Sequence, residues 1–140
     1  MRFWDSSALV ALFVRESRSA EVLALLQEDR EILVSILARV EITSALWRRT
    51  RARQFASGER EIADDSFKRI ASIWTEVGDF LETRGLAVAL LAKYPLRTGD
   101  AIQLASAVQA ANGNAAKLPF VTLDHDLAVA AMAEGFPVLP

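Results

Sequence analysis

The sequence predicts an α/β fold in which a central, mostly parallel sheet is flanked by helices. Short apolar segments, typical of strands covered on both faces, alternate along the chain with longer segments of helical periodicity. No obvious linker, repeat or low-complexity tract interrupts this alternation. A chain of 140 residues is long enough for a substantial core. We therefore expect residues 1–140 to form a single domain.

The first part of the chain is predicted to alternate between two strands and three helices. A short aromatic segment at the start suits a buried strand, and small residues after it open a helix. Ser17 and Ser19 offer caps for a second helix with an apolar side. Ile32–Val34 is a continuous apolar run typical of a buried strand, and a long helix follows it. These elements are expected at Arg2–Asp5, Ser6–Val14, Ala20–Gln27, Glu31–Ser35 and Leu37–Gln54.

The second part is predicted to continue in the same manner. Apolar residues recur at helical spacing from Glu59 to Trp74, and Asp79 suits the cap of a further helix that Tyr94-Pro95 ends. We interpret the two helices within Glu59–Lys93 as a pair inserted between sheet elements. The elements are expected at Glu59–Trp74, Thr75–Val77, Phe80–Lys93, 98–111, Phe120–Thr122, Asp124–Ala133 and Phe136–Leu139.

Composition excludes several classes of protein. The absence of cysteine excludes disulfides, thiolate metal sites and cysteine nucleophiles, and a single histidine excludes zinc-type histidine clusters. The longest apolar runs fall far short of the roughly 18 residues that suggest a membrane span. Arg2 and Asp5 do not suit a secretion signal, so a cytoplasmic protein without membrane contact is expected. A net charge of −2 means that any nucleic-acid contact must come from local patches or from a bound metal.

Four acidic residues lie where predicted strands give way to helices: Asp5, Glu41, Asp100 and Asp124. Because the carboxyl ends of parallel strands share one edge of a sheet, these side chains can meet at one point. Two unit charges about 4 Å apart repel by about 1 kcal/mol in water and about 4 kcal/mol near a protein surface. Four gathered carboxylates therefore need a compensating cation, and oxygen ligands favour Mg²⁺ or Mn²⁺. The pattern predicts a divalent metal site.

Each acid also has an ordinary structural explanation. Asp5, Asp100 and Asp124 suit helix N-caps, and Glu41 suits a helix start or a partner for Arg48. Taken one at a time, these explanations suffice. Taken together, they leave unexplained why the caps at three separate junctions are all acidic, whereas a metal site explains it.

Polar side chains accompany the acids at the same edge. The hydroxyls of Ser6, Ser7 and Thr122 are expected to bond to carboxylates, to a metal-bound water or to loop backbone. Gln103, one turn after Asp100, can bond to it or to a ligand, although a surface position is more common. His125 and Asp126, beside the last acid, have no assigned role.

The run from Arg48 to Arg53 is the clearest cationic patch. On a helix these side chains spread around the circumference, so some of them face solvent. They suit the C-terminal dipole of their helix. Alternatively, Arg48 and Arg49 contact phosphate groups beside the acidic site, on the same helix as Glu41.

At these residues the chain resembles PIN domains. The opening Phe3-Trp4-Asp5-Ser6-Ser7-Ala8-Leu9-Val10 and the later blocks Arg39–Ile42, Leu96–Ala105 and Phe120–Asp124 are similar to the family's blocks, in the same order, over nearly the whole chain. The size and the alanine-rich block after Asp100 are most similar to VapC-type toxins of bacterial and archaeal toxin–antitoxin pairs.

The resemblance implies an α/β/α sandwich and a magnesium- or manganese-dependent endoribonuclease. By that analogy Asp5, Glu41 and Asp100 are the core acids, and Asp124 is a more variable fourth. The resemblance further implies a homodimer and a cognate antitoxin whose C-terminal segment blocks the acidic pocket. Cleavage of tRNA, rRNA or mRNA by a metal-activated water is the expected reaction.

Two positions depart from the family pattern. Ser6 stands where the family often has threonine, a change that keeps the hydroxyl. Gln103 stands where many members have histidine, so a role of that histidine does not carry over to this chain.

Two other functions fit parts of the sequence. A phosphoryl-transfer domain with an aspartyl nucleophile would carry an acidic pair after the first strand and a lysine after Phe120–Thr122, and this chain lacks both. A catalytically silent PIN-like module that binds a basic partner peptide through its acids would have nearly the same sequence. Metal-dependent RNA cleavage distinguishes the nuclease from both.

Overall fold

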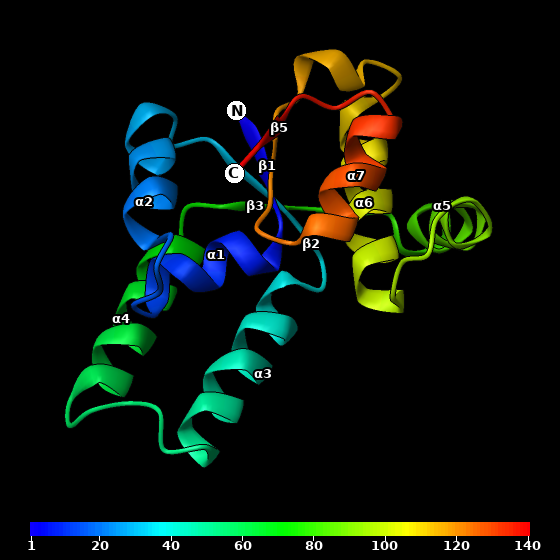
Figure 1. The fold of residues 1–140 in the computed structure, drawn as a ribbon. Coiled ribbons are helices and arrows are strands. Elements are labelled where there is room, and N and C mark those ends of the chain that lie inside the picture. The colour runs from blue at the N-terminus through cyan, green and yellow to red at the C-terminus, as the bar shows by residue number, and fades with distance from the viewer.

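The computed structural model describes residues 1–140 and contains a five-stranded sheet with helices on both faces (Figure 1). All the strand pairings are parallel, and the strand order is β3-β2-β1-β4-β5. The expected α/β/α architecture is confirmed. The strands are β1 (Arg2–Trp4), β2 (Ile32–Ser35), β3 (Thr75–Val77), β4 (Phe120–Val121) and β5 (Val138–Leu139).

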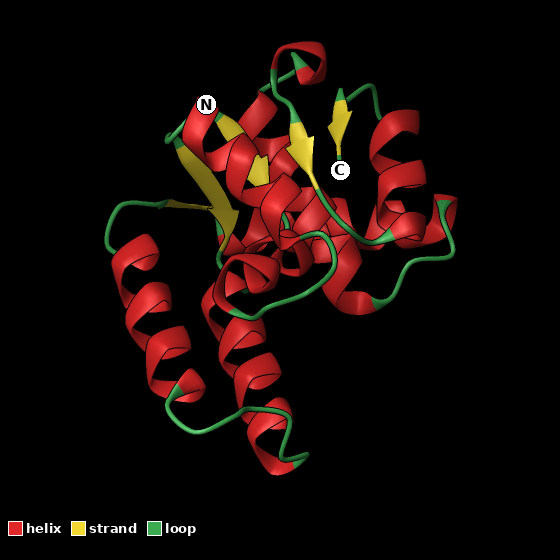
Figure 2. Cartoon of the chain, turned by 60° about the vertical axis from the view of Figure 1, so that its left-hand side comes forward, coloured by secondary structure: helices red, strands yellow, loops and turns green.

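The helices divide into two layers. In Figure 1 α1 to α4 lie on one side of the sheet and α5 to α7 on the other, and Figure 2 shows the strands enclosed between them. The helices are α1 (Ser6–Phe13), α2 (Ser19–Glu28), α3 (Ala38–Arg51), α4 (Glu59–Ala71), α5 (Phe80–Lys93), α6 (Thr98–Ala111) and α7 (His125–Ala133), with a 3₁₀ turn at Ala115–Lys117.

Strand β1 explains why the core has two halves. Successive side chains of a strand point to opposite faces of the sheet. Trp4 packs in the core beneath α1 to α4, and Phe3 packs in the core beneath α5 to α7. Both side chains are fully buried, and Phe3 stacks on Phe120 of the neighbouring strand with ring centroids 5.3 Å apart.

Several predicted boundaries need correction. The helix expected over Leu37–Gln54 ends at Arg51, because Arg53 adopts a left-handed backbone with φ 54° and turns the chain towards α4. The helix expected over Glu59–Trp74 ends at Ala71. The two helices in Glu59–Lys93 are not simply an inserted pair, since β3 lies between them and pairs with β2 at the edge of the sheet.

No helix combines the length with the apolar character that crossing a membrane would require.

Candidate functional site

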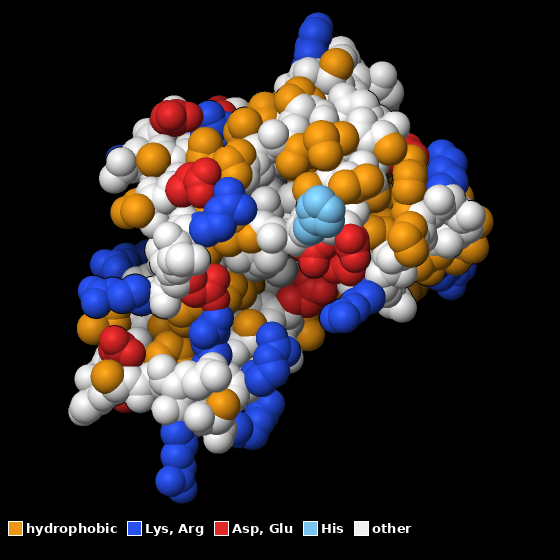
Figure 3. Space-filling model, in the orientation of Figure 1, with side chains coloured by type: hydrophobic (Ala, Val, Ile, Leu, Met, Phe, Trp, Pro, Cys, Tyr) orange, Lys and Arg blue, Asp and Glu red, His pale blue; other side chains and the backbone are white.

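The four predicted acids line one pocket at the carboxyl-terminal edge of the sheet. The pocket has a volume of about 590 Å³, and Figure 3 shows acidic side chains gathered in a recess with basic side chains beside it. Asp5 follows β1, Glu41 lies in the first turn of α3, Asp100 lies in the first turn of α6, and Asp124 caps α7. The parallel sheet therefore brings together acids from the two ends of the chain.

Asp5 is the most buried of the four, with 4% of its surface exposed. Its backbone N–H extends the sheet ladder to Val121, at 2.9 Å. Its Oδ2 accepts hydrogen bonds from the Ser7 backbone at 3.1 Å, from Thr122 Oγ1 at 3.0 Å and from the Ser7 hydroxyl. The carboxylate therefore caps α1, as its ordinary explanation requires, and its other oxygen stays free for a ligand.

The surroundings of Asp5 disfavour its negative charge. Burial raises the pKa of Asp5 to about 6, against the opposing effect of the hydrogen bonds from Ser7 and Thr122. The charge of Glu41 raises this pKa further. A nearby cation would stabilise the ionised form of a carboxylate in this environment.

Glu41 is fixed by two neighbours that come from other elements. Ser6 Oγ donates to Glu41 Oε2 at 2.6 Å, and Gln103 Nε2 donates to the same oxygen. Pairing with Arg48, one of the two structural explanations considered for Glu41, is not formed. The carboxylate is thus directed to the site by α1 and α6, and its other oxygen, Oε1, lies beside Gly99.

Asp100 and Asp124 combine capping with a position in the pocket. Asp100 accepts the backbone N–H of Arg97 at 3.3 Å, and Asp124 accepts that of Leu127 at 2.8 Å. Burial first, and then the charges of Asp124 and Glu41, raise the pKa of Asp100. The raised pKa shows that capping does not remove the mutual repulsion of the acids.

The side chains of the pocket are chemically suited to a divalent cation. The acidic side chains offer only oxygen atoms as metal ligands, which Mg²⁺ and Mn²⁺ prefer. Neighbouring carboxylates also raise the pKa of Asp5 and of Asp100, as expected where negative charges lie close together. In the present conformation no group of three acidic or histidine side chains is arranged to hold a metal ion. Binding therefore requires the free oxygens to draw together, or contacts through water, which Mg²⁺ commonly retains.

The basic rim of the pocket is formed by Arg48, Arg49 and Arg97. Arg49 forms an ion pair with Glu16, from the turn between α1 and α2, whereas Arg48 and Arg97 form no ion pair. Arg97 and Glu16 were not among the residues predicted for the site. The position of Arg97 directly before α6 was a usable signal for the arginine, but no local pattern places Glu16 near α3.

Three further polar residues considered in the sequence lie in different places in the structure. Gln103 is not at the surface and does not bond to Asp100; it is 1% exposed and bonds to Ser6 and Glu41. His125 and Asp126 are exposed and do not line the acidic pocket.

Comparison with known proteins identifies relatives of this architecture. A model of the PIN domain family matches residues 2–132. Among solved structures, PAE2754 from Pyrobaculum aerophilum has 23% identity and a TM-score of 0.60, over 92% of this chain and 83% of that one. A toxin–antitoxin complex from Klebsiella pneumoniae has 22% identity and a TM-score of 0.64, over 100% and 97%. FitAcB from Neisseria gonorrhoeae has 12% identity and a TM-score of 0.67, again over 100% and 97%.

At these identities, the solved structures show a common fold. No curated protein matches the chain significantly in sequence.

Proposed function

The chain belongs to the PIN domain family, and we propose that it is a metal-dependent endoribonuclease that acts as the toxin of a toxin–antitoxin pair. PIN domains are generally nucleases and typically use divalent metal ions. The observation that carries the proposal is the convergence of Asp5, Glu41, Asp100 and Asp124 on one pocket. Their charges are not balanced by ion pairs within the chain.

The four acids have different proposed roles in binding Mg²⁺ or Mn²⁺. Asp5 and Asp100 would be the direct ligands, Glu41 would be a ligand or orient a water, and Asp124 would contribute to holding a second ion. A bound divalent ion supplies an activated water and stabilises charge on the leaving oxygen of the phosphodiester. Thr122 and Ser6 hold the carboxylates of Asp5 and Glu41 in place.

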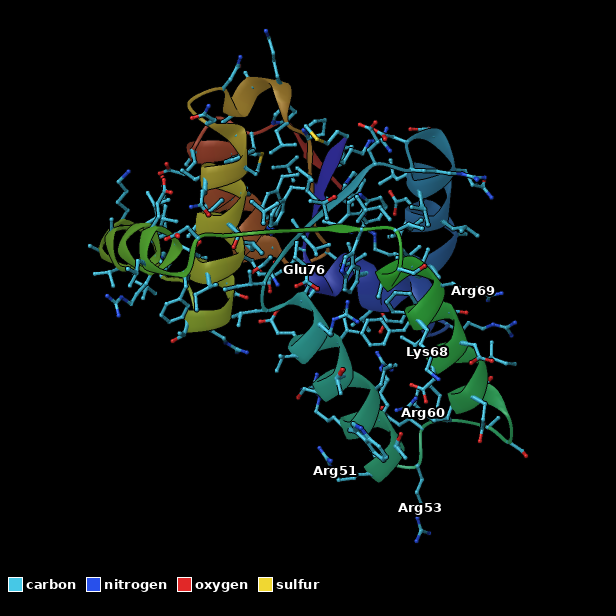
Figure 4. All side chains as sticks on the ribbon, turned by 180° about the vertical axis from the view of Figure 1, so that it is seen from behind. Arg51, Arg53, Arg60, Lys68, Arg69 and Glu76 are labelled. Carbon is cyan, nitrogen blue, oxygen red and sulfur yellow. The ribbon has the colours of Figure 1, made fainter.

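Arginines beside the pocket bind the RNA backbone. Arg48 lines the pocket and has no carboxylate partner, so its charge is available to a phosphate group. Arg49 is partly neutralised by Glu16 and contributes less. Figure 4 shows Arg51 at the end of α3 and Arg53 projecting from the turn that follows it, which extends the cationic surface away from the acids. The substrate is a tRNA, rRNA or mRNA.

Two protein partners complete the proposal. A cognate antitoxin covers the acidic pocket with its C-terminal segment, and one of the similar solved structures is a toxin–antitoxin complex. A second copy of the chain forms a homodimer. The exposed apolar side chains of α5, including Phe80 at 64%, Leu81 at 65% and Val88 at 65%, support such a contact. The pair acts in the cytoplasm.

Cleavage of tRNA and rRNA by the purified chain, with Mn²⁺ and with a chelator, tests the proposal. We expect cleavage with Mn²⁺, no cleavage with the chelator, and none by the Asp100→Asn variant. Asp126→Asn is the matched control, because Asp126 is exposed and lies outside the pocket. Cleavage by the Asp100→Asn variant would contradict the assigned site. Binding of a basic peptide without any cleavage would instead favour the catalytically silent module.

A further inference from the structure

Two residues one turn apart on α6 enclose the carboxylate of Glu41. A Cβ atom added to Gly99 would lie 2.7 Å from Glu41 Oε1, closer than real Cβ contacts allow. On the other side, Gln103 Nε2 donates to Glu41 Oε2. Residues four apart on a helix share a face, so α6 presents Gly99 and Gln103 to the carboxylate together.

The backbone does not explain the glycine at position 99. Gly99 lies in the first turn of α6 with an ordinary helical conformation, and it has no positive φ. Glycine weakens a helix relative to alanine, so the fold alone would favour alanine here. The nearest atoms to the missing side chain are those of the Glu41 carboxylate. The glycine is therefore explained by the space that Glu41 occupies.

The burial of Gln103 is likewise explained by Glu41. Its side chain is 1% exposed, its Nε2 donates to Ser6 Oγ at 2.6 Å as well as to Glu41, and its Oε1 has no hydrogen-bond partner. A buried amide with an unpaired oxygen destabilises a protein relative to an apolar residue of similar size. Stability therefore does not account for Gln103, whereas its contacts with Ser6 and Glu41 do.

We propose that Gly99 and Gln103 are positioning residues that fix the Glu41 carboxylate at the wall of the acidic pocket. Gly99 leaves room for Oε1, and Gln103, with Ser6, holds Oε2. The consequence for metal binding rests on the proposed function, while the positioning itself does not. Removal of a group that orients a metal ligand typically lowers metal affinity by about 10- to 100-fold.

Substitution of Gly99 by alanine separates positioning from folding. In Gly99→Ala the carboxylate must move, because Ser6 and Gln103 hold it against the new methyl group. Gly85→Ala is the matched control, since Gly85 is also in a helix and a Cβ atom there meets nothing within 4 Å. We expect Gly85→Ala to keep or raise the melting temperature. Gly99→Ala should stay close to the wild-type melting temperature, because the gain in helix propensity offsets the weakened bonds to Glu41. Only Gly99→Ala should lower the Mn²⁺ affinity of the full-length chain, by about tenfold.

A second substitution tests whether the effect passes through Glu41. Glu41→Asp withdraws the carboxylate by one methylene group, so adding Gly99→Ala to it should cost little further Mn²⁺ affinity. Gln103→Met, which keeps the length but removes the donor, should lower the affinity in the wild-type background. Equal losses from Gly99→Ala in the wild-type and Glu41→Asp backgrounds would overturn the proposal, since coupled residues are not additive.

A measurement without metal distinguishes the positioning of Glu41 from the proposed metal-dependent nuclease. In the metal-free protein, the side-chain amide signals of Gln103 in ¹⁵N NMR spectra report its bond to Glu41. We expect Gly99→Ala to shift these signals and Gly85→Ala to leave them unchanged. Unshifted signals would overturn the positioning of Glu41. Shifted signals in a protein that binds no Mn²⁺ would support the positioning and contradict the metal-dependent nuclease.

Discussion

The hydroxyl of Thr122 donates to Oδ2 of Asp5 at 3.0 Å, across 117 positions of the chain. Thr122 directly follows β4 and Asp5 directly follows β1, and these strands are neighbours in the sheet. The same hydroxyl accepts the backbone N–H of Asp124 at 3.1 Å. One side chain thus links the first and the fourth acid of the pocket.

Replacing this hydroxyl should weaken both stability and activity. Thr122→Val keeps the shape of the side chain but leaves Asp5 with fewer donors and the Asp124 N–H without its acceptor. We expect a loss of about 1–3 kcal/mol in the free energy of unfolding, measured in urea, because buried polar groups lose their partners. RNA cleavage should fall as well. Thr122→Ser keeps the hydroxyl and should stay close to wild type; an equal loss in both variants would contradict this role.

Asp5 should limit the stability of the metal-free protein at neutral pH. The pKa of Asp5 rises from its usual 3.8 to about 6 on folding, so the folded state binds the proton more tightly than the unfolded state. The stabilisation is complete below pH 4 and is lost as the pH rises through about 6. At pH 7.5 the ionised buried carboxylate then costs up to about 3 kcal/mol.

Asp5→Asn removes this charge and keeps an oxygen that accepts from Ser7 and Thr122. We expect Asp5→Asn to raise the free energy of unfolding at pH 7.5 in the presence of a chelator, with little gain at pH 4, while cleavage is abolished. Urea unfolding at the two pH values measures the difference. A variant that is less stable at both values would show that the charge is already balanced in the folded protein.

The convergence of the acids was predictable because it follows from topology. In a parallel sheet, residues that end neighbouring strands share an edge, and the sequence marks strand ends by the change from apolar runs to helical periodicity. Asp5 and Asp124 needed no knowledge of side-chain packing to be placed on that edge. The capping bonds of Asp5, Asp100 and Asp124 show that a capping role and a position in the pocket coexist in the same residues.

Contacts made by side chains across the fold were not predictable in this way. For Gln103 the sequence left open a bond to Asp100, a bond to a ligand or a surface position, because a glutamine one turn into a helix gives no sign of the Ser6 and Glu41 side chains beside it. The closeness of Gly99 to Glu41 and the ion pair of Arg49 with Glu16 likewise depend on how helices pack. Helical periodicity locates a face of a helix but not its partner.

Metal affinity should depend on pH through Asp5. Because the carboxyl must lose its proton before it can bind Mn²⁺, affinity should be nearly constant above pH 7 and fall by up to about tenfold per pH unit below pH 6. Titration of the purified chain with Mn²⁺ from pH 5 to pH 8 gives this profile. A flat profile would mean that Asp5 is not a ligand or is ionised throughout this range.

The proposed homodimer should depend on the exposed apolar face of α5. Val88 is 65% exposed, so Val88→Asp should leave the free energy of unfolding of the monomer nearly unchanged while placing a charge in the contact. We expect light scattering to show a monomer for this variant and a dimer for the wild type. Val129→Asp, which changes an exposed valine on α7, is the control and should stay dimeric. A monomeric wild type, or a dimeric Val88→Asp variant, would contradict this contact.

Arg48 should contribute more to RNA binding than Arg49. Arg48 lines the pocket without an ion pair, whereas Arg49 already bonds to Glu16. In the inactive Asp100→Asn background, Arg48→Ala should weaken RNA binding and reduce the slope of log affinity against log salt concentration by about 1, as expected for one lost phosphate contact. Arg49→Ala should change the slope less.

Lys117→Ala controls for the loss of one positive charge, because Lys117 precedes β4 and lies at the opposite edge of the sheet from the acids. Its salt slope should equal that of the parent. Equal effects of all three substitutions would indicate attraction by net charge alone, without a binding surface on α3. The distinction matters because a chain with a net charge of −2 gains no general attraction for RNA, so the proposed RNA binding depends on local attraction by the arginines beside the pocket.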